Sequence, residues 1–334
     1  MSQNKRFVWA DSLKGWLMVL VIIGHVIQTV RGEVMNDSHL WNIIYSFHMP
    51  AFMAVSGWLA YREIKQLDYQ ESLWRRARQL LIPYGVWSLL FLSIRGNSSW
   101  ASLADILLKP DLFFWFLWVL FFICALFILS QWISEHFHIN EIYILLLLCV
   151  SLMCIMVITE FRLFGFQFIS YYFLFYTLGY CIHKYPQMQI ENKLVLLLLV
   201  IIWAVLAWSW KMHELPGWIP LIPHLPSSLL QYVYRGLTAF IAISFILNSA
   251  HLFLNSKSGV NGLMAKLGKV SLGLYVVHLL LMELIVMGVT SIFPSLTVTM
   301  TEVLTFVIAF TLSVAIVILL MKNKWTAMIG LGKI

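Results

Sequence analysis

Residues 8–30 read VWADSLKGWLMVLVIIGHVIQTV, a stretch that is apolar apart from Asp11, Lys14 and a few other polar positions. A helix of about 20 apolar residues crosses the hydrocarbon core of a bilayer. Lipid offers no hydrogen-bond partner to an open backbone group, so such a stretch must be helical. It lacks a small-x-small cleavage site, and we therefore expect a retained membrane span and not a cleaved signal peptide.

Nine further apolar stretches of spanning length follow the first one. They lie at residues 40–60, 79–96, 112–133, 139–159, 165–183, 194–210, 228–250, 270–290 and 299–321. The 334-residue chain is 61% hydrophobic and only 11% charged, whereas about a quarter of the residues of a soluble domain are charged. The sequence predicts one all-α polytopic domain over residues 1–334, with about ten transmembrane helices.

The basic residues predict how these helices are oriented. If the N-terminus is cytoplasmic, fifteen of the 22 Lys and Arg residues lie on the cytoplasmic side and six on the other. Cytoplasmic loops of membrane proteins carry such an excess. We therefore expect a multi-pass protein of the cell inner (plasma) membrane with both ends inside. The net charge of +7 then reports topology, and we do not expect nucleic acid to be a partner.

The four cysteines all lie inside apolar stretches. They are Cys124, Cys149, Cys154 and Cys181, and their spacing matches neither a CxxC motif nor a Cys/His zinc motif. We expect no metal site and no disulfide, and interpret these thiols as small apolar side chains.

The first span carries three ionisable residues on one helical face. Lys14 and His25 are eleven residues apart, which is within about 20° of three full helical turns and places them roughly 16 Å apart along the axis. Asp11 points in nearly the same direction. Charged groups inside a membrane are costly and usually functional. The alternatives are an Asp11–Lys14 ion pair near the inner surface and a His25 side chain that is simply packed against a neighbouring helix.

The second span contains His48 and Pro50 in the sequence Phe-His-Met-Pro, followed by Ser56-Gly57. We expect Pro50 to kink this span and free a carbonyl group. His48 and His25 lie at similar depths below the outer surface, so both imidazoles can face one cavity. The alternative is a kinked helix with a hydrogen-bonded histidine and no chemical role.

The ninth span carries Ser271, Tyr275 and His278 at positions i, i+4 and i+7. Residues at this spacing share one helical face. They form either the polar lining of a site or a hydrogen-bonded lock between helices.

Arg75 and Arg78 stand in a predicted cytoplasmic loop just before the third span. Arginines at i and i+3 can bind phosphate oxygens from one helix face. The alternative is ordinary anchoring by basic residues at the membrane surface.

The segment between Lys211 and Ser228 holds four of the nine prolines, so we expect no regular helix there. It is either a cap over an opening or a stiff connecting loop. The residues on which this interpretation rests are Trp210, Pro216, Trp218, Pro220, Pro223, His224 and Pro226.

Taken in order, these motifs resemble the transmembrane acyltransferase-3 family, in particular its branch similar to fucose 4-O-acetylases. The resemblance runs from Asp11 to about His278. The motifs that carry it are Lys14-x10-His25, Phe47-His-Met-Pro50 with Ser56-Gly57, Arg75-x-x-Arg78, Trp115-Phe-Leu117, Leu178-Gly-Tyr180 and Gly268-Lys-x-Ser-Leu-Gly-Leu-Tyr-x-x-His278.

The resemblance implies transfer of an acetyl group from cytoplasmic acetyl-CoA, the donor substrate, to a hydroxyl of a surface polysaccharide or lipid-linked sugar. His25 would be the general base or the acyl carrier, because an imidazole titrates near the working pH. Many relatives have Arg where this chain has Lys14. The implied catalytic group is His25, Lys14, Asp11 and His48; Arg75, Arg78 and Lys14 would hold the donor; and Ser271, Tyr275, His278 and Trp115 would line the substrate and oxyanion site.

A proton-coupled transporter is the alternative function, with His25, His48 and His278 as a proton relay. Such proteins are commonly built from two related halves with broken helices at the membrane midplane. The sequence contains no visible internal repeat, which favours the enzyme.

Overall fold

The computed structural model describes residues 7–64, 68–96, 99–212, 214–219 and 226–333. All regular elements in these ranges are helical, which confirms the all-α prediction. Six residues used in the topology and loop predictions lie outside the described residues: Lys5, Arg6, Lys65, Pro220, Pro223 and His224.

Helices occupy all ten predicted ranges, and eight helical segments of the described chain are long and apolar enough to cross a membrane. These contain α1 (Val8–Arg31), α2 with α3 (His39–Tyr45 and His48–Ile64), α4 (Tyr69–Ile94), α6 (Trp115–Phe137), α7 (Glu141–Thr159), α10 (Ser227–Phe253), α12 (Ser271–Ile292) and α13 (Val298–Leu320). The other two predicted spans coincide with α8 (Phe166–Lys184) and the shorter α9 (Lys193–Trp208). The total of ten and the orientation stay predictions.

Three short helices were not predicted. They are α5 (Trp100–Leu108), α11 (Gly259–Gly268) and α14 (Lys324–Leu331). A six-residue 3-10 helix lies at Gly32–Asp37, and single 3-10 turns lie at Pro110–Leu112, Leu163–Gly165 and Pro186–Met188. The described residues of the proline-rich segment up to Pro226 form no regular helix, as expected, and α10 begins at Ser227.

The chain divides into two compact units. The first contains residues 1–55 and 187–318, and the second contains residues 56–186 and 319–334. The chain passes from the first unit to the second within α3 and returns after α8. Each unit is described by itself below.

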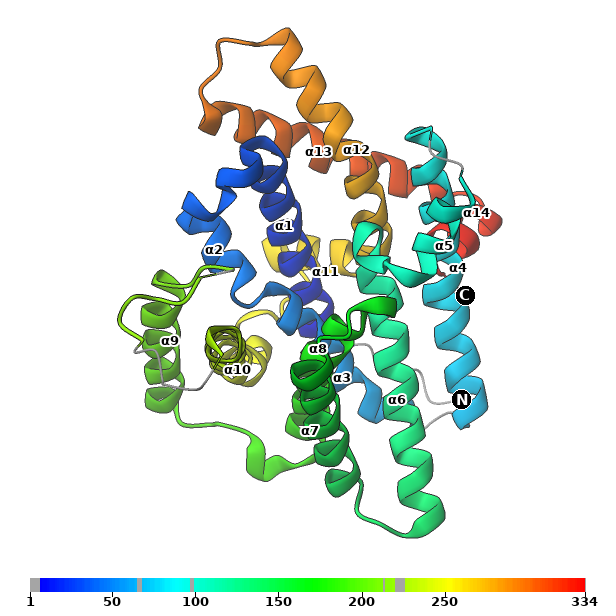
Figure 1. Cartoon of the computed structure of the whole chain (residues 1–334), viewed down its shortest axis with the longest axis vertical. Helices are drawn as coiled ribbons and strands as arrows, with labels where there is room; N and C mark the ends of the chain where they lie inside the picture. The colour runs from blue at the N-terminus through cyan, green and yellow to red at the C-terminus, as the bar shows by residue number, and fades with distance from the viewer. Residues whose placement is uncertain (1–6, 65–67, 97–98, 213, 220–225, 334) are drawn as a thin grey trace. The chain divides into compact units, whose positions relative to one another are not determined.

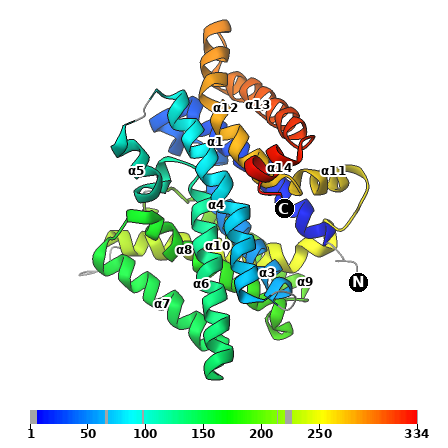
Figure 2. The same cartoon turned by 90° about the vertical axis from the view of Figure 1, so that its right-hand side faces the viewer.

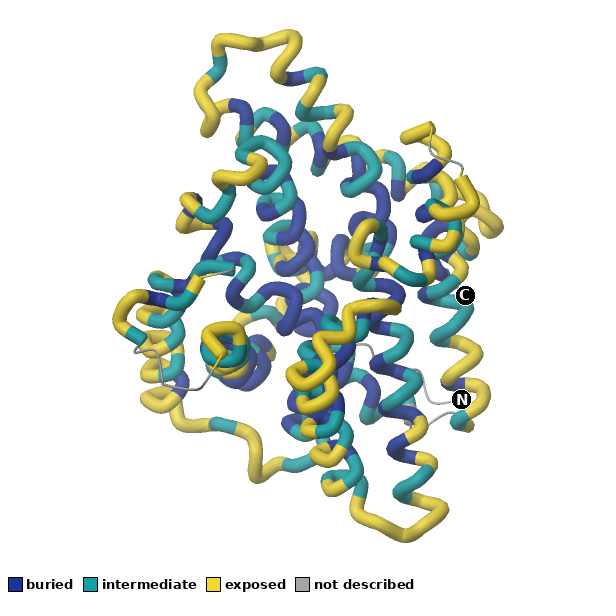
Figure 3. Tube along the Cα trace, viewed as in Figure 1, coloured by how far each residue is buried: buried dark blue, intermediate teal, exposed yellow. Residues whose placement is uncertain are grey.

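In the first unit α1 is the central helix and packs against α2, α10, α11 and α12 (Figure 1). It is mostly buried, whereas the connection between α12 and α13 is exposed (Figure 3). The crossing of α1 with α11 is especially close: a Cβ atom added at Gly268 would lie 1.8 Å from the carbonyl oxygen of Asp11, and one added at Gly15 would lie 2.0 Å from that of Met264. Only glycine permits this approach, as in other small-residue contacts between membrane helices.

The predicted second span is interrupted between α2 and α3, but not where we expected. The break falls at Ser46 and Phe47, and Pro50 is the third residue of α3. A proline in the first turn of a helix removes no intrahelical hydrogen bond, because the first N–H groups have no partner there. The prediction that Pro50 kinks the span was therefore wrong, because the interruption lies three to four residues before the proline.

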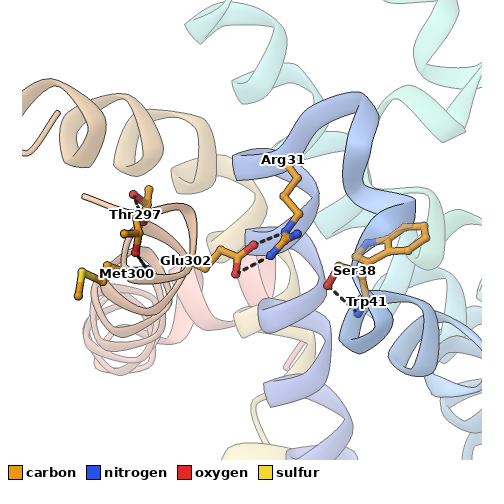
Figure 4. A network of polar contacts seen from close by, with 7 residues as sticks. Arg31, Ser38, Trp41, Thr297, Met300 and Glu302 are labelled. Atoms are coloured by element: carbon orange, nitrogen blue, oxygen red, sulfur yellow. Dashed lines mark hydrogen bonds and ion pairs between the residues drawn. The ribbon is translucent and has the colours of Figure 1, made fainter. Parts of the chain in front are cut away.

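An ion pair fastens α13 to the C-terminal end of α1. The Arg31 Nε atom lies 2.5 Å from Oε1 of Glu302, and a second guanidinium nitrogen contacts the other carboxylate oxygen (Figure 4). Nearby, the Ser38 hydroxyl accepts a hydrogen bond from the Trp41 backbone N–H and so caps α2 (Figure 4). These contacts fix the ends of α1, α2 and α13 on one side of the unit.

In the second unit α4 and α6 run side by side, and α8 packs against both α6 and α7 (Figure 2). A Cβ atom at Gly57 would lie 1.9 Å from the carbonyl oxygen of Tyr176, so the Ser-Gly motif allows α3 to contact α8 closely. The helix α4 begins at Tyr69, and the arginines at positions 75, 76 and 78 therefore lie on a helix. The prediction that they stand in a loop was wrong.

Candidate active site

His25 and His278 face each other in the first unit. Their ring centroids are 5.3 Å apart and their planes are inclined by 52°. His25 comes from α1, seventeen residues after the start of the helix, and is half-buried. His278 comes from the middle of α12 and is fully buried. The structure therefore brings together two imidazoles that are 253 positions apart in the chain.

The hydrogen bonds of His278 and His48 define which ring nitrogen is available for chemistry. Nδ1 of His278 lies 2.8 Å from the carbonyl oxygen of Leu274, and Nδ1 of His48 lies 2.7 Å from that of Ile44. A carbonyl oxygen only accepts, so Nδ1 carries the proton in both rings. In the neutral ring Nε2 then holds the lone pair. Both histidines thus present a proton acceptor, which does not favour them as neutral donors to an oxyanion.

His48 is held by a residue that the sequence analysis did not single out. The ring of Tyr45 contacts the His48 ring edge-on at 4.7 Å and stacks on Trp41 at 4.0 Å. Its hydroxyl donates to Oε1 of Gln28 on α1, at 2.8 Å. Trp41, Tyr45 and His48 are spaced i, i+4 and i+7, and this helical stripe was the sequence signal that we missed.

These contacts place His48 near the His25–His278 pair. Gln28 lies one helical turn after His25 on α1, and Tyr45 joins it to the His48 ring. The three histidines, from α1, α3 and α12, therefore lie in one region of the first unit, and the cavity shared by His25 and His48 stays a prediction.

Lys14 and Asp11 form the ion pair that was one of the two alternatives. The Lys14 Nζ atom lies 2.9 Å from Oδ1 of Asp11, and the lysine side chain stays 21% exposed. The Ser12 hydroxyl donates to the carbonyl oxygen of Asn261 on α11, at 2.8 Å. Together with the Gly268 contact, this bond fixes the N-terminal half of α1 against α11.

Ser271 and Tyr275 lie on the same helix as His278. Tyr275 is buried and its ring centroid is 6.0 Å from that of His278. Ser271 is the first residue of α12 and is half-buried. Tyr275 thus stands beside the histidine cluster, and Ser271 lies one helical turn before it.

The predicted phosphate-binding arginines belong to the second unit. Arg75 is exposed, and Arg78 is half-buried with its guanidinium 5.7 Å from the centre of the Trp74 ring. The buried Nε atom of Arg78 has no hydrogen-bond partner within the described chain. Phosphate binding by these two side chains stays a prediction.

Arg76, which the sequence analysis passed over, points into the second unit. It forms an ion pair with Glu63, and a small cavity beside this pair is also lined by Ser72, Cys124 and Tyr176. The sequence signal was again helical spacing, because the buried face of α4 contains Ser72, Leu80, Pro83, Tyr84 and Trp87, and position 76 falls on that face.

Trp115 is the first residue of α6 in the second unit, as predicted for the start of the fourth span. It stacks on Phe168 at 4.6 Å and on Tyr172 at 5.4 Å. This aromatic stack joins the beginnings of α6 and α8. A role for Trp115 in lining a substrate site stays a prediction.

Among the described residues, no group of three or more His, Cys, Asp or Glu side chains is arranged to hold a metal ion. The cysteines are free thiols: Cys124 and Cys149 are buried, Cys181 is half-buried and Cys154 is exposed.

Comparison with known proteins gives a family and two relatives. A family model described as an acyltransferase domain matches residues 7–322. The nodulation protein NolL of Sinorhizobium fredii is 35% identical over 150 residues, which is 39% of this chain and 40% of the relative. Nodulation protein NolL of Mesorhizobium japonicum is 35% identical over 127 residues, 35% of this chain and 34% of the relative. The matches thus span well under half of either relative, and no solved structure matches.

Proposed function

The chain belongs to the acyltransferase family whose model matches residues 7–322, and from this premise we propose that it is an O-acetyltransferase of the inner membrane. It would move an acetyl group from cytoplasmic acetyl-CoA to a hydroxyl of a surface polysaccharide or of its lipid-linked precursor. The family match supports an acyltransferase, and the eight apolar helices support a membrane protein. The donor, the acceptor and the roles of individual residues are our proposal.

The observation that carries the proposal is the histidine cluster of the first unit. Transfer of an acetyl group to an alcohol needs a base that takes the hydroxyl proton during attack on the thioester carbonyl. His25 is half-buried, so it is reachable, whereas His48 and His278 are buried beside it. His25 is therefore the residue that we assign to the reacting atoms.

The reaction balances with His25 as the base. The acceptor oxygen bonds to the thioester carbonyl carbon while its proton moves to a ring nitrogen of His25. The tetrahedral intermediate then expels the CoA sulfur, which takes the proton from the imidazolium. In the other route, a ring nitrogen of His25 attacks the thioester carbonyl and expels the CoA thiolate, and the acceptor oxygen then takes the acetyl group from that nitrogen, with the hydroxyl proton ending on the CoA sulfur. A developing oxyanion needs hydrogen-bond donors, and Tyr275 and Ser271 carry suitable hydroxyls.

We assign donor binding to Arg75 and Arg78 of the second unit, and name Lys14 as a separate candidate for contact with the donor in the first unit. The exposure of Arg75 and the unpaired Nε of Arg78 support this assignment, because arginine binds phosphate oxygens through several donors at once. Lys14 keeps its charge partly exposed although it pairs with Asp11. Asp11 would then act by orienting Lys14, and Trp115 is a candidate for contact with substrate within the second unit.

The test of the reaction is a His25→Ala variant assayed for glycan acetylation by mass spectrometry and proton NMR. We expect activity to fall by at least about a thousandfold with unchanged membrane insertion and thermal stability. The matched control is His251→Ala, which removes an exposed histidine from α10 of the same unit. Full acetylation by the His25 variant would refute the proposed role.

The test of the donor site is Arg75→Gln combined with Arg78→Gln, measured by binding of radiolabelled acetyl-CoA to purified protein. Donor affinity should fall about 10- to 100-fold, while affinity for the acceptor is kept. Arg162→Gln is the control, since this residue is exposed in the same unit outside α4. An equal loss of donor and acceptor binding would indicate a structural role for the two arginines instead.

A further inference from the structure

The Nε2 atom of His278 is a buried hydrogen-bond acceptor without a role in the proposed reaction. His278 is 0% exposed, and its Nδ1 proton is committed to the Leu274 carbonyl oxygen. Nε2 has no hydrogen-bond partner among the described residues. Buried polar atoms are nearly always paired, so an unpaired one calls for an explanation.

The ring nearest to that atom on the opposite helix belongs to His25. Two imidazoles joined by an N–H···N bond of about 2.9 Å have ring centroids roughly 5 Å apart, because each nitrogen lies about 1 Å from its centroid. The observed separation is 5.3 Å, so the two rings are close enough for this bond, although it is not formed in the structure because Nε2 of His278 has no partner there. The inclination of 52° between the planes does not prevent such a bond, because rotation about the N–H···N axis leaves it linear.

We propose that His278 is a positioning residue, and that a small rotation of the His25 ring lets Nε2 of His278 accept a hydrogen bond from a ring N–H of His25 in the working protein. This bond fixes the His25 tautomer and turns its other ring nitrogen, with the lone pair, toward the substrates. The inference rests on the proposed function, and it gives His278 a different role from the substrate lining predicted from the sequence.

The pairing explains how the cluster assists proton transfer. When the acceptor hydroxyl gives its proton to the free nitrogen of His25, that ring becomes a cation. Its other N–H group still points at Nε2 of His278, and a hydrogen bond from a charged donor is about twice as strong as a neutral one. The Leu274 carbonyl oxygen completes the chain by holding the proton on Nδ1 of His278. The arrangement follows the orienting logic of a catalytic triad, with a neutral imidazole as the orienting group.

The kinetic test compares two replacements of His278. In His278→Gln the side-chain oxygen can reach the place of Nε2 and accept, whereas His278→Leu has similar bulk and no acceptor. We expect kcat of the leucine variant to fall about 10- to 100-fold with unchanged KM for both substrates, and the glutamine variant to recover most of the loss. His251→Leu is the control for a histidine in the same unit that lies exposed. Equal kcat for wild type and His278→Leu would overturn the proposal.

A second measurement detects the hydrogen bond directly and does not depend on catalytic activity or on a variant of His278. In the wild-type protein with 15N-labelled histidine, reconstituted in lipid, an N–H···N bond gives a 15N–15N coupling between the two rings, and His251→Leu should retain it. Absence of that coupling in the wild type would overturn the pairing. If the coupling is present but the wild type transfers no acyl group from acetyl-CoA, the proposed function fails and the hydrogen bond stands.

Discussion

A single methyl group added at Gly268 should disable the protein, and the structure gives the size of the effect. The new Cβ atom would lie 1.8 Å from the carbonyl oxygen of Asp11, whereas carbon and oxygen atoms in close contact are about 3.3 Å apart. The two helices must therefore separate by roughly 1.5 Å at this point. The obstacle is backbone on both sides, so no side chain can turn away to relieve it.

Separation of α11 from α1 has two measurable consequences for Gly268→Ala. Overpacking of this kind costs about 1–3 kcal/mol of stability. The last residue of α11 is joined through Lys269 and Val270 to Ser271, the first residue of α12, so the shift reaches the helix that carries His278. A displacement of about 1 Å at a reacting group lowers rates by around a hundredfold. We expect both effects together.

The assay is thermal unfolding followed by tryptophan fluorescence in lipid nanodiscs, together with acetyl transfer at saturating substrate. Gly15→Ala should behave similarly, because its Cβ atom would meet Met264 from the other side of the same crossing. The matched control is Gly288→Ala in α12, where a Cβ atom has nothing within 4 Å and helix propensity favours alanine by about 1 kcal/mol. If Gly268→Ala melts and turns over like the wild type, the close crossing of α1 and α11 is not a constraint on this protein.

Three further predictions concern the ion pairs and the topology. Reversing one charge with Arg31→Glu should lower the melting temperature, and adding Glu302→Arg should restore it; a double variant as unstable as the single one would count against the α1–α13 contact. Glu63→Gln should destabilise the second unit by about 2 kcal/mol, because Arg76 would lose its carboxylate; unfolding in denaturant would measure this, and Glu63→Met with Arg76→Met should recover most of the loss. A fluorescent protein fused to the C-terminus should fold and fluoresce if both ends are cytoplasmic, and its failure to do so beside a positive cytoplasmic control would reverse the predicted orientation.

Hydropathy predicted the positions of the long helices well because lipid imposes a simple rule. Every backbone polar group must be paired within the span, so each long apolar stretch becomes a helix. The same rule does not act on α11, whose sequence GVNGLMAKLG is short and mixed. Its helix depends on packing against α1, which is a tertiary contact that periodicity within one segment cannot reveal.

The sequence predicted which site residues share one face of a helix. It did not predict which residues of different helices contact each other. Helical spacing placed Lys14 with His25, and Tyr275 with His278, on shared stripes. It could not show that His25 on α1 and His278 on α12 face each other, because that is a contact between helices far apart in the sequence.

Arg76 was missed because the α4 boundary was placed ten residues too late. With a helix beginning at Tyr69, position 76 joins the buried face of α4. If residues 69–78 are taken as a loop, nothing in the sequence distinguishes the inward-facing arginine among Arg75, Arg76 and Arg78. The error in one boundary therefore became an error in which arginine was expected to face inward.

The histidine cluster also shows why imidazoles suit the interior of a membrane protein. A neutral imidazole brings one N–H donor into a region without water, and that donor must find an acceptor. For His48 and His278 the acceptor is the carbonyl oxygen four residues earlier in the chain. This bond removes the cost of burying the donor and at the same time fixes the lone pair on Nε2. A lysine or carboxylate at the same depth would need a counter-ion to remain charged, as Lys14 and Arg76 have in Asp11 and Glu63. The bond that makes a buried histidine tolerable is thus also the bond that prepares it to accept a proton.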